Sequence, residues 1–131
     1  GYGYNHSDLK ESNNNNSIVI GDINKNLFHE LINVNTANKL NFGGKPSGFD
    51  FSYFNHVNFS PDGKYIIFLF MLSKNNIRYS RLGIYNFNNN KFDFISFEDW
   101  NPSHFNFINN NEIVLTLNKR KKSKLSLGVK R

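Results

Sequence analysis

The sequence of 131 residues has no cysteine, only three prolines and no long uninterrupted apolar segment. Without cysteine the chain forms neither disulfides nor thiolate metal sites, which suits a reducing compartment. No apolar stretch approaches the roughly 20 residues that cross a bilayer. Residues 1–10 also lack the basic-then-apolar order of a secretion signal. We therefore expect a cytoplasmic location and no membrane partner.

Acidic residues are absent from residues 119–131, which hold seven of the 16 lysines and arginines. Residues 1–118 carry nine basic and ten acidic side chains and are close to neutral. The net charge of +6 is therefore a property of this basic tail. Such a run can contact phosphate or anionic lipid, but a solvated tail is the simpler interpretation. We do not expect a nucleic-acid partner.

Convincing helix signals are also few, whereas strand signals are frequent. Residues 26–40 have some i, i+3, i+4 spacing, but their asparagine and β-branched residues disfavour a helix. Segments rich in β-branched and aromatic residues predict strands at 17–23, 56–60, 65–72, 81–87, 91–97 and 112–117. Turn formers separate several of them, namely Ser-Pro-Asp-Gly at 60–63 and asparagine runs at 88–90 and 109–111. The sequence therefore predicts an all-β chain.

The turn at 60–63 has a defined expected geometry. Pro61 presets φ at the leading corner, and Gly63 accepts the positive φ that closes a hairpin. Asp62 is interpreted as part of this turn and not as a catalytic base.

Two internal similarities suggest a repeated unit. The segment HVNFSPDGKYIIF, which starts at His56, aligns with HFNFINNNEIVLT, which starts at His104, at an offset of 48 residues. This alignment places YIIF on IVLT without a gap. A weaker similarity places residues 20–32 on residues 84–96. Each aligned stretch has the order strand, polar turn, strand.

A period of 48 residues lies near the roughly 40–50 residues of a propeller blade, which is a four-stranded antiparallel sheet. We therefore predict a partial β-propeller over residues 1–118, followed by the basic tail. Its predicted parts are an outer half blade (17–33), a long connection (34–55), a complete blade (56–97) and an inner half blade (104–117). About two blades cannot close a ring of about four to eight. The open blade edges therefore predict self-association with another copy.

A family resemblance supports the same fold. FSPDGKYIIF resembles the repeat signature of TolB-type and WD40-like bacterial propellers. The motifs NHVNFSPDGKYIIFLF, RYSRLGIYNF and PSHFNFINNNEIVLT, after an N-terminal GYGY, are similar to bacterial propellers related to oligogalacturonate lyase. In that group histidines on the channel face coordinate a divalent metal, and the reaction is β-elimination from a uronic acid sugar. The resemblance thus implies Mn²⁺ or a similar ion in a complete propeller, although many relatives have no established activity.

The two aligned histidines are the first candidate site residues. In a propeller the first strand of each blade lines the channel, and the start of that strand lies on the channel rim. His56 and His104 would therefore face the channel mouth from adjacent blades. Two neutral imidazoles could hold a divalent cation there if other blades supplied the remaining ligands. The alternative is a structural role, in which each histidine hydrogen-bonds to a neighbouring blade.

Four further residues are candidates for sugar binding. Arg78 and Arg81, expected just before the third strand, could bind a carboxylate in a bidentate manner. Tyr79 and Trp100 could stack on a sugar face. The alternatives are an exposed strand cation for Arg81 and a packing residue for Trp100.

Three functions stay open at this point. The first is a propeller that binds or processes an anionic, uronic acid-type carbohydrate. The second is a protein-interaction scaffold with structural histidines. The third is a truncated propeller fragment without independent activity. Catalysis by this chain alone is not expected, because part of a ring cannot supply a full coordination shell.

Overall fold

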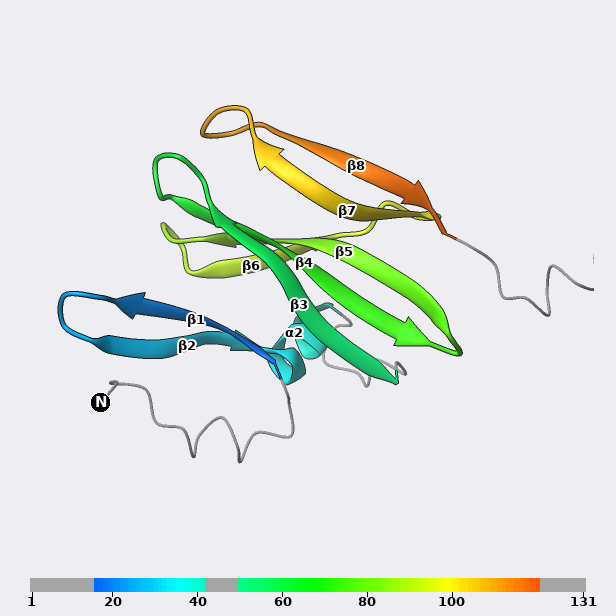
Figure 1. Cartoon of the computed structure of the whole chain (residues 1–131), viewed down its shortest axis with the longest axis horizontal. Coiled ribbons are helices and arrows are strands. Elements are labelled where there is room, and N and C mark those ends of the chain that lie inside the picture. The colour runs from blue at the N-terminus through cyan, green and yellow to red at the C-terminus, as the bar shows by residue number, and fades with distance from the viewer. Residues whose placement is uncertain (1–15, 42–49, 121–131) are drawn as a thin grey trace, which may run out of the picture. The chain divides into compact units, whose positions relative to one another are not determined.

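A computed structural model describes residues 16–41 and 50–120 of the chain (Figure 1). The chain divides between Ser47 and Gly48 into two compact units, which we describe separately. The described residues form antiparallel sheets and one helix. The expectation of a chain built mostly from antiparallel strands is thus confirmed, although helix α2 was not expected in residues 34–41.

The first unit contains the hairpin of β1 (Ser17–Asp22) and β2 (Leu27–Asn33), followed by helix α2 (Val34–Asn41). The side-chain oxygen of Asn33 accepts a hydrogen bond from the backbone N–H of Thr36 at 2.9 Å. This bond satisfies a donor that the first turn of a helix leaves free, so Asn33 acts as the N-cap. The capping interaction explains why a helix forms in residues whose average propensity is low.

The described residues of the second unit, 50–120, form six strands in two sheets. The first sheet has the order β3-β4-β5-β6 and is antiparallel throughout. Its strands are β3 (Phe51–Phe59), β4 (Tyr65–Lys74), β5 (Ile77–Asn86) and β6 (Lys91–Ile95). The second sheet is the hairpin of β7 (Trp100–Phe107) and β8 (Ile113–Lys119).

The four-stranded grouping predicted for residues 56–97 is confirmed, but several boundaries differ. Strand β3 begins at Phe51 and β7 at Trp100, so both start before the histidine that was expected to open them. The expected connection 34–55 begins where β2 ends and contains helix α2, but its end is wrong, because residues 51–55 belong to β3. The early part of β3 had been missed because FSYF lies outside the aligned repeat.

The turn between β3 and β4 has the expected geometry. Gly63 has a φ of +74°, and its N–H donates to the carbonyl of Ser60 at 2.9 Å. The hydroxyl of the buried Ser60 donates to Asp62 Oδ1 at 2.8 Å, and the N–H of Lys64 donates to the same oxygen at 3.1 Å. These bonds hold the pKa of Asp62 below its ordinary value, chiefly through the Ser60 hydroxyl.

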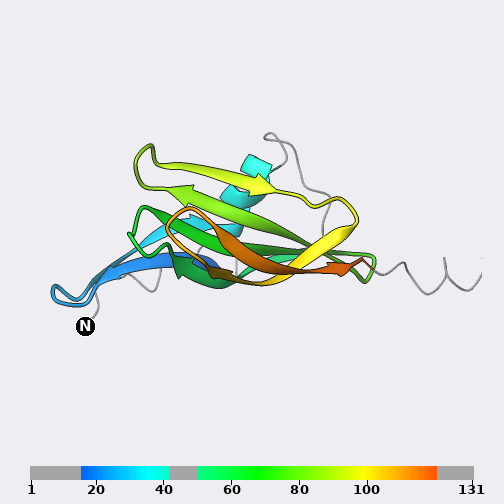
Figure 2. The same cartoon turned by 90° about the horizontal axis from the view of Figure 1, so that it is seen from above.

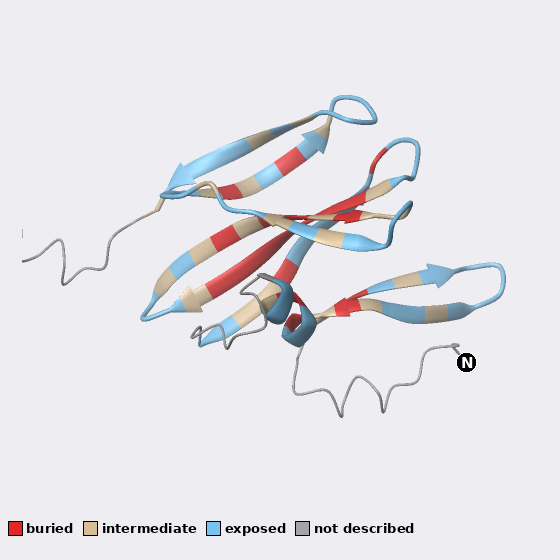
Figure 3. Cartoon of the chain, turned by 180° about the vertical axis from the view of Figure 1, so that it is seen from behind, coloured by how far each residue is buried: buried red, intermediate tan, exposed pale blue. Residues whose placement is uncertain are grey.

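Strand β4 is buried along almost its whole length, as the continuous red stretch in Figure 3 shows. Because side chains alternate along a strand, it must be covered on both faces. On one face Phe68 and Phe70 contact the rings of Phe54 and Phe94. The sheet core on this side is therefore largely aromatic.

The opposite face of the sheet packs against the β7–β8 hairpin (Figure 2). Its cluster of buried residues consists of Ile67, Leu69, Met71, Leu82 and Phe105. Partly buried residues of β8, among them Ile113 and Leu115, pack against this cluster. Two sheets thus lie face to face within the second unit, and Ser80 fixes their relation by donating its hydroxyl hydrogen to the Pro102 carbonyl at 2.7 Å.

The weaker of the two internal similarities is reproduced by the backbone. Gly21 pairs with Phe28 in the first hairpin, and Tyr85 pairs with Phe92 at the corresponding positions of β5 and β6. The last turn residue is asparagine in both hairpins, with a φ of 56° at Asn26 and 57° at Asn90. The pairs β1–β2 and β5–β6 are therefore structurally equivalent at an offset of 64 residues.

The stronger similarity needs a correction of one residue. Phe59 pairs with Ile66, whereas Phe107 pairs with Ile113. The first strands thus correspond at an offset of 48 residues, but β8 corresponds to β4 at 47. The gapless alignment of YIIF with IVLT is wrong, because the turn before β8 is one residue shorter. A shift of one residue exchanges the two faces of a strand, so Ile113 and Leu115 correspond to Ile66 and Phe68.

The sheets of the described residues are open, and no closed ring of sheets is present among them. No helix in these parts of the chain is long and apolar enough to cross a membrane.

Candidate functional site

His56 lies within a β-bulge of β3, where the pairing register shifts between Asn55 and Asn58. Its φ is 51°, a left-handed conformation that is uncommon outside glycine. The side-chain oxygen of Asn55 accepts a hydrogen bond from the His56 N–H at 3.0 Å, which satisfies a donor at the bulge. The bulge thus redirects an exposed imidazole in the sixth position of the strand.

His104 lies on β7, directly after that strand's own register shift between Pro102 and His104. The centres of the His56 and His104 rings are 4.9 Å apart, and their planes meet at 69°. Both side chains are exposed. The sequence analysis therefore placed the two histidines together correctly. Its prediction that they stand at the starts of their strands is wrong, because both lie near the middle.

The two imidazoles do not by themselves make a metal site. Within the described ranges, no group of three or more histidine, cysteine, aspartate or glutamate side chains could hold an ion. Tetrahedral protein sites use four ligands, and even open catalytic sites use three. An ion at His56 and His104 would need ligands from outside these residues.

Arg78, Tyr79 and Arg81 lie inside β5 and not before it, which corrects the expected position of the two arginines. The guanidinium of Arg120, directly after β8, lies 4.5 Å from the centre of the Tyr79 ring. Burial lowers the pKa of the Arg81 guanidinium, and the nearby charge of Arg120 lowers it further.

Asn101 organises this group and was missed by the sequence analysis. Strand β6 pairs with β5 only up to Leu82, so none of the described strands pairs with this edge of β5 before that residue. The Asn101 carboxamide accepts from the Ser80 N–H at 3.2 Å and donates to the Arg78 carbonyl at 2.8 Å. It thereby replaces a neighbouring strand at this edge.

The same amide oxygen also positions the cation. Arg120 donates from Nε and Nη2 to Asn101 Oδ1, at 3.4 and 3.2 Å. No local signal in the sequence could have revealed this bond, since Asn101 lies on β7, Arg120 follows β8, and Asn101 also bonds to β5.

Trp100 is half-exposed at the start of β7. The Lys119 ammonium lies 5.2 Å from the centre of its ring and 4.0 Å from Asp99. The ring therefore already contacts a cation of its own hairpin, and stacking on a sugar would compete with that contact.

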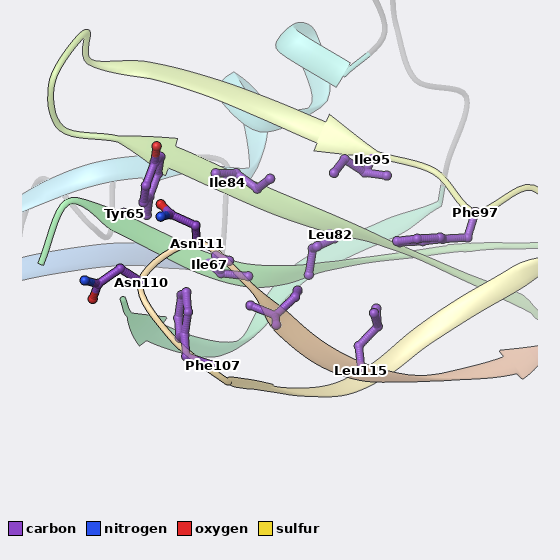
Figure 4. A pocket seen from close by; sticks show the side chains of 11 residues that line it. Tyr65, Ile67, Leu82, Ile84, Ile95, Phe97, Phe107, Asn110, Asn111 and Leu115 are labelled. Carbon is purple, nitrogen blue, oxygen red and sulfur yellow. The ribbon is translucent and has the colours of Figure 1, made fainter. Parts of the chain in front are cut away.

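A pocket of about 400 Å³ lies between the four-stranded sheet and the β7–β8 hairpin (Figure 4). Apolar side chains form most of its wall, while Tyr65, Asn110 and Asn111 lie at one end. The apolar lining residues are Ile67, Leu82, Ile84, Ile95, Phe97, Phe107, Ile113 and Leu115. A wall of this kind does not suit a charged sugar, so the pocket is not the carbohydrate site expected from the sequence.

No protein-family model, no curated protein and no solved structure matches this chain. The resemblance to propellers related to oligogalacturonate lyase therefore stays an expectation that depends on the short motifs quoted above.

Proposed function

We propose that this chain is a β-propeller segment that binds an anionic, uronic acid-type carbohydrate on the face that carries His56 and His104. The observation that carries the proposal is the contact of these rings at 4.9 Å, from the first strands of two consecutive sheets. Two exposed imidazoles side by side offer hydrogen-bond donors and acceptors to hydroxyl and carboxylate groups. Such an exposed pair fits a ligand surface better than a buried structural contact.

The positive charge that the proposed ligand requires would come from Arg78, which is on the same face of β5 as Ser80 and so on the side of the β7–β8 hairpin. Arg81 lies directly opposite Phe70 and therefore shares the other face of the sheet. Besides burial, the charge of Arg120 acts on Arg81 and lowers its pKa. Arg78 is exposed on the same strand. Tyr79 already stacks on Arg120, so we assign it the role of positioning that cation rather than of contacting sugar.

The proposal concerns binding and not catalysis by this chain alone. The described residues provide two imidazoles but no complete set of metal ligands. A divalent ion such as Mn²⁺ would have to be completed by side chains from further blades, and no step is assigned to it.

The test is a titration of the whole chain with trigalacturonate, followed by NMR at the imidazole and backbone resonances. We expect shifts at both histidines, and a loss of affinity of at least about tenfold in the variant His56→Ala with His104→Ala. His29→Ala is the matched control, because His29 is an exposed histidine of the β1–β2 hairpin. Maltotriose, which carries no carboxylate, controls for the charge of the sugar.

Unchanged trigalacturonate binding in the double variant, or equal binding of maltotriose, would contradict the proposal. Repeating the titration with Mn²⁺ tests the ion separately, since a paramagnetic ion near the pair broadens the imidazole signals.

A scaffold in which the histidines are structural is the second candidate. It is favoured by the left-handed backbone of His56, because the surrounding structure must hold that conformation in place. In that case the double variant lowers the melting temperature, while no ligand affinity changes. The third candidate, a fragment without independent activity, predicts that the purified chain lacks a single well-folded β-rich species in size exclusion and circular dichroism.

A further inference from the structure

The described residues contain one whole four-stranded sheet and two halves of the same unit. The β1–β2 hairpin has the register and the turn of β5–β6, the outer pair of the whole sheet. The β7–β8 hairpin corresponds to β3–β4, the other pair. In chain order the repeat therefore runs outer half, whole sheet, inner half. Among the described strands, neither half is joined to the pair that would complete it to a whole sheet.

The edge of β8 shows what is lacking. Among the described strands β8 pairs only with β7, whereas β4 pairs with both β3 and β5. Leu117 is 37% exposed, while Phe70, its equivalent in β4, is 0% exposed. Apolar side chains at an open strand edge favour pairing with a further strand. The apolar pocket lies between this hairpin and the four-stranded sheet (Figure 4). A further strand beside β8 would therefore lie next to it.

We propose that the β1–β2 hairpin of a second copy of this chain pairs with β8 and completes a four-stranded sheet in the order β7-β8-β1-β2. The register follows from the whole sheet, in which Phe68 pairs with Gly83 and Phe70 with Arg81. Transferred by the offsets of 47 and 64 residues, Leu115 of one copy lies opposite Val19 of the next. Leu117 lies opposite Ser17.

The side chains at this register are complementary in size. In the whole sheet the large Phe68 ring lies opposite a glycine, which leaves it room. In the composite sheet Leu115 lies opposite Val19. Two side chains of medium size then fill the space that one large ring fills in the whole sheet. Val19 is 39% exposed, and this pairing would turn it toward the pocket wall.

Each copy carries both a donor hairpin and an acceptor edge, so the contact is head-to-tail. Such heterologous contacts close into rings or continue as filaments. Each contact between two copies would form one composite four-stranded sheet, in addition to the β3–β6 sheet within each copy. This inference depends on the repeat and the open edge, and not on the carbohydrate proposal.

Cysteine crosslinking tests the register directly, because the chain has no cysteine of its own. Ser17→Cys and Leu117→Cys are made as separate full-length proteins, mixed and oxidised. Opposite residues of antiparallel strands lie within the distance that a disulfide spans. We expect a mixed dimer on a non-reducing gel at a level well above either protein alone. Leu27→Cys mixed with Leu117→Cys is the matched control and should not crosslink.

The oligomeric state provides a second readout. Light scattering should give a discrete multiple of 15.3 kDa for the unaltered chain. Val19→Lys should shift the mass to that of one chain, because it places a charge against the pocket. Leu27→Lys should leave the mass unchanged, since Leu27 is 53% exposed and its equivalent in the whole sheet is the exposed Lys91.

A monomer at a concentration of tens of micromolar, without a mixed disulfide between Ser17→Cys and Leu117→Cys, would overturn the proposal. A protein with both substitutions that forms the disulfide within one chain, at a yield independent of concentration, would also overturn it. Neither result depends on sugar binding, so a failure here is distinguishable from a failure of the proposed function.

Discussion

Phe68 lies directly opposite Gly83 in the four-stranded sheet, and its ring fills the space that a Cβ on Gly83 would need. The ring is fully buried and contacts Phe54 and Phe94, so it has little freedom to move away. The missing side chain at one position thus permits the large side chain at the other.

Gly83→Ala should therefore destabilise the fold by about 1–3 kcal/mol, the usual cost of overpacking a core. The measurement is the free energy of unfolding from urea titration. The same substitution in a Phe68→Leu background should cost clearly less, because the smaller side chain leaves room for the methyl group. Equal costs in both backgrounds would show that the two residues are not coupled.

Asn101→Ala should destabilise the chain by about 1–3 kcal/mol, because it leaves the Ser80 N–H and the Arg78 carbonyl without their partner at the β5 edge. Amide exchange at Ser80 should accelerate. Asn106→Ala provides the control, since Asn106 is an exposed asparagine on the same strand. An effect of equal size at both positions would argue against the edge-capping role.

Stability should decrease in acid through Asp62. Its folded pKa lies below the ordinary value, so the folded state favours the ionised carboxylate. This contribution is present above the unfolded pKa of about 3.9 and is lost as the pH falls through the folded pKa.

Asp62→Asn retains an oxygen acceptor but not the charge. It should lose less stability than the unaltered chain does as the pH falls from about 5 to about 2. Urea midpoints at several pH values provide the measurement, and Asp93→Asn, which removes an exposed carboxylate of β6, is the control. An unchanged acid response in Asp62→Asn would contradict the assignment.

The backbone of His56 can be tested apart from its ring. His56→Gly and His56→Ala both remove the imidazole contact with His104, but only glycine adopts a φ of 51° without cost. The glycine variant should therefore be the more stable by about 1 kcal/mol.

The order should be reversed at His104, which does not have a positive φ. There glycine in a strand should be the less stable variant, by about 0.5–1 kcal/mol. Thermal unfolding of the four single variants gives both comparisons, and the same order at both sites would contradict the argument.

Local chemistry made much of the fold predictable. The turn at 60–63 follows from Pro61, Asp62 and Gly63 alone, and the strands that it joins follow from their β-branched and aromatic residues. The equivalence of the two outer hairpins could also be predicted, since their asparagine turns and apolar positions recur at a fixed spacing.

The helix and the register were not predictable in the same way. Helix α2 begins with a capping bond to the Asn33 side chain. The average helix propensity of residues 26–40 does not include such an interaction. The one-residue difference at β8 depends on how the turn before it closes, from Ile108 to Glu112, and a gapless alignment conceals that.

The candidate site was likewise predictable only in part. The repeat predicted that His56 and His104 would be neighbours, because equivalent residues of stacked units lie close together. Neither the bulge that turns His56 outward nor the position of the arginines inside β5 could be predicted from spacing.

The sequence by itself determined which segments become strands and which become turns, because those preferences are set by side chains within a few residues of each other. Only the tertiary structure decided that Asn101 would cap the edge of β5 and bind Arg120. Asn101 is about 20 residues from both Ser80 and Arg120. Its bond to β5 exists only after the β7–β8 hairpin has packed on the four-stranded sheet. The physical reason is that hydrogen bonds across sheets depend on packing geometry, which no local pattern encodes.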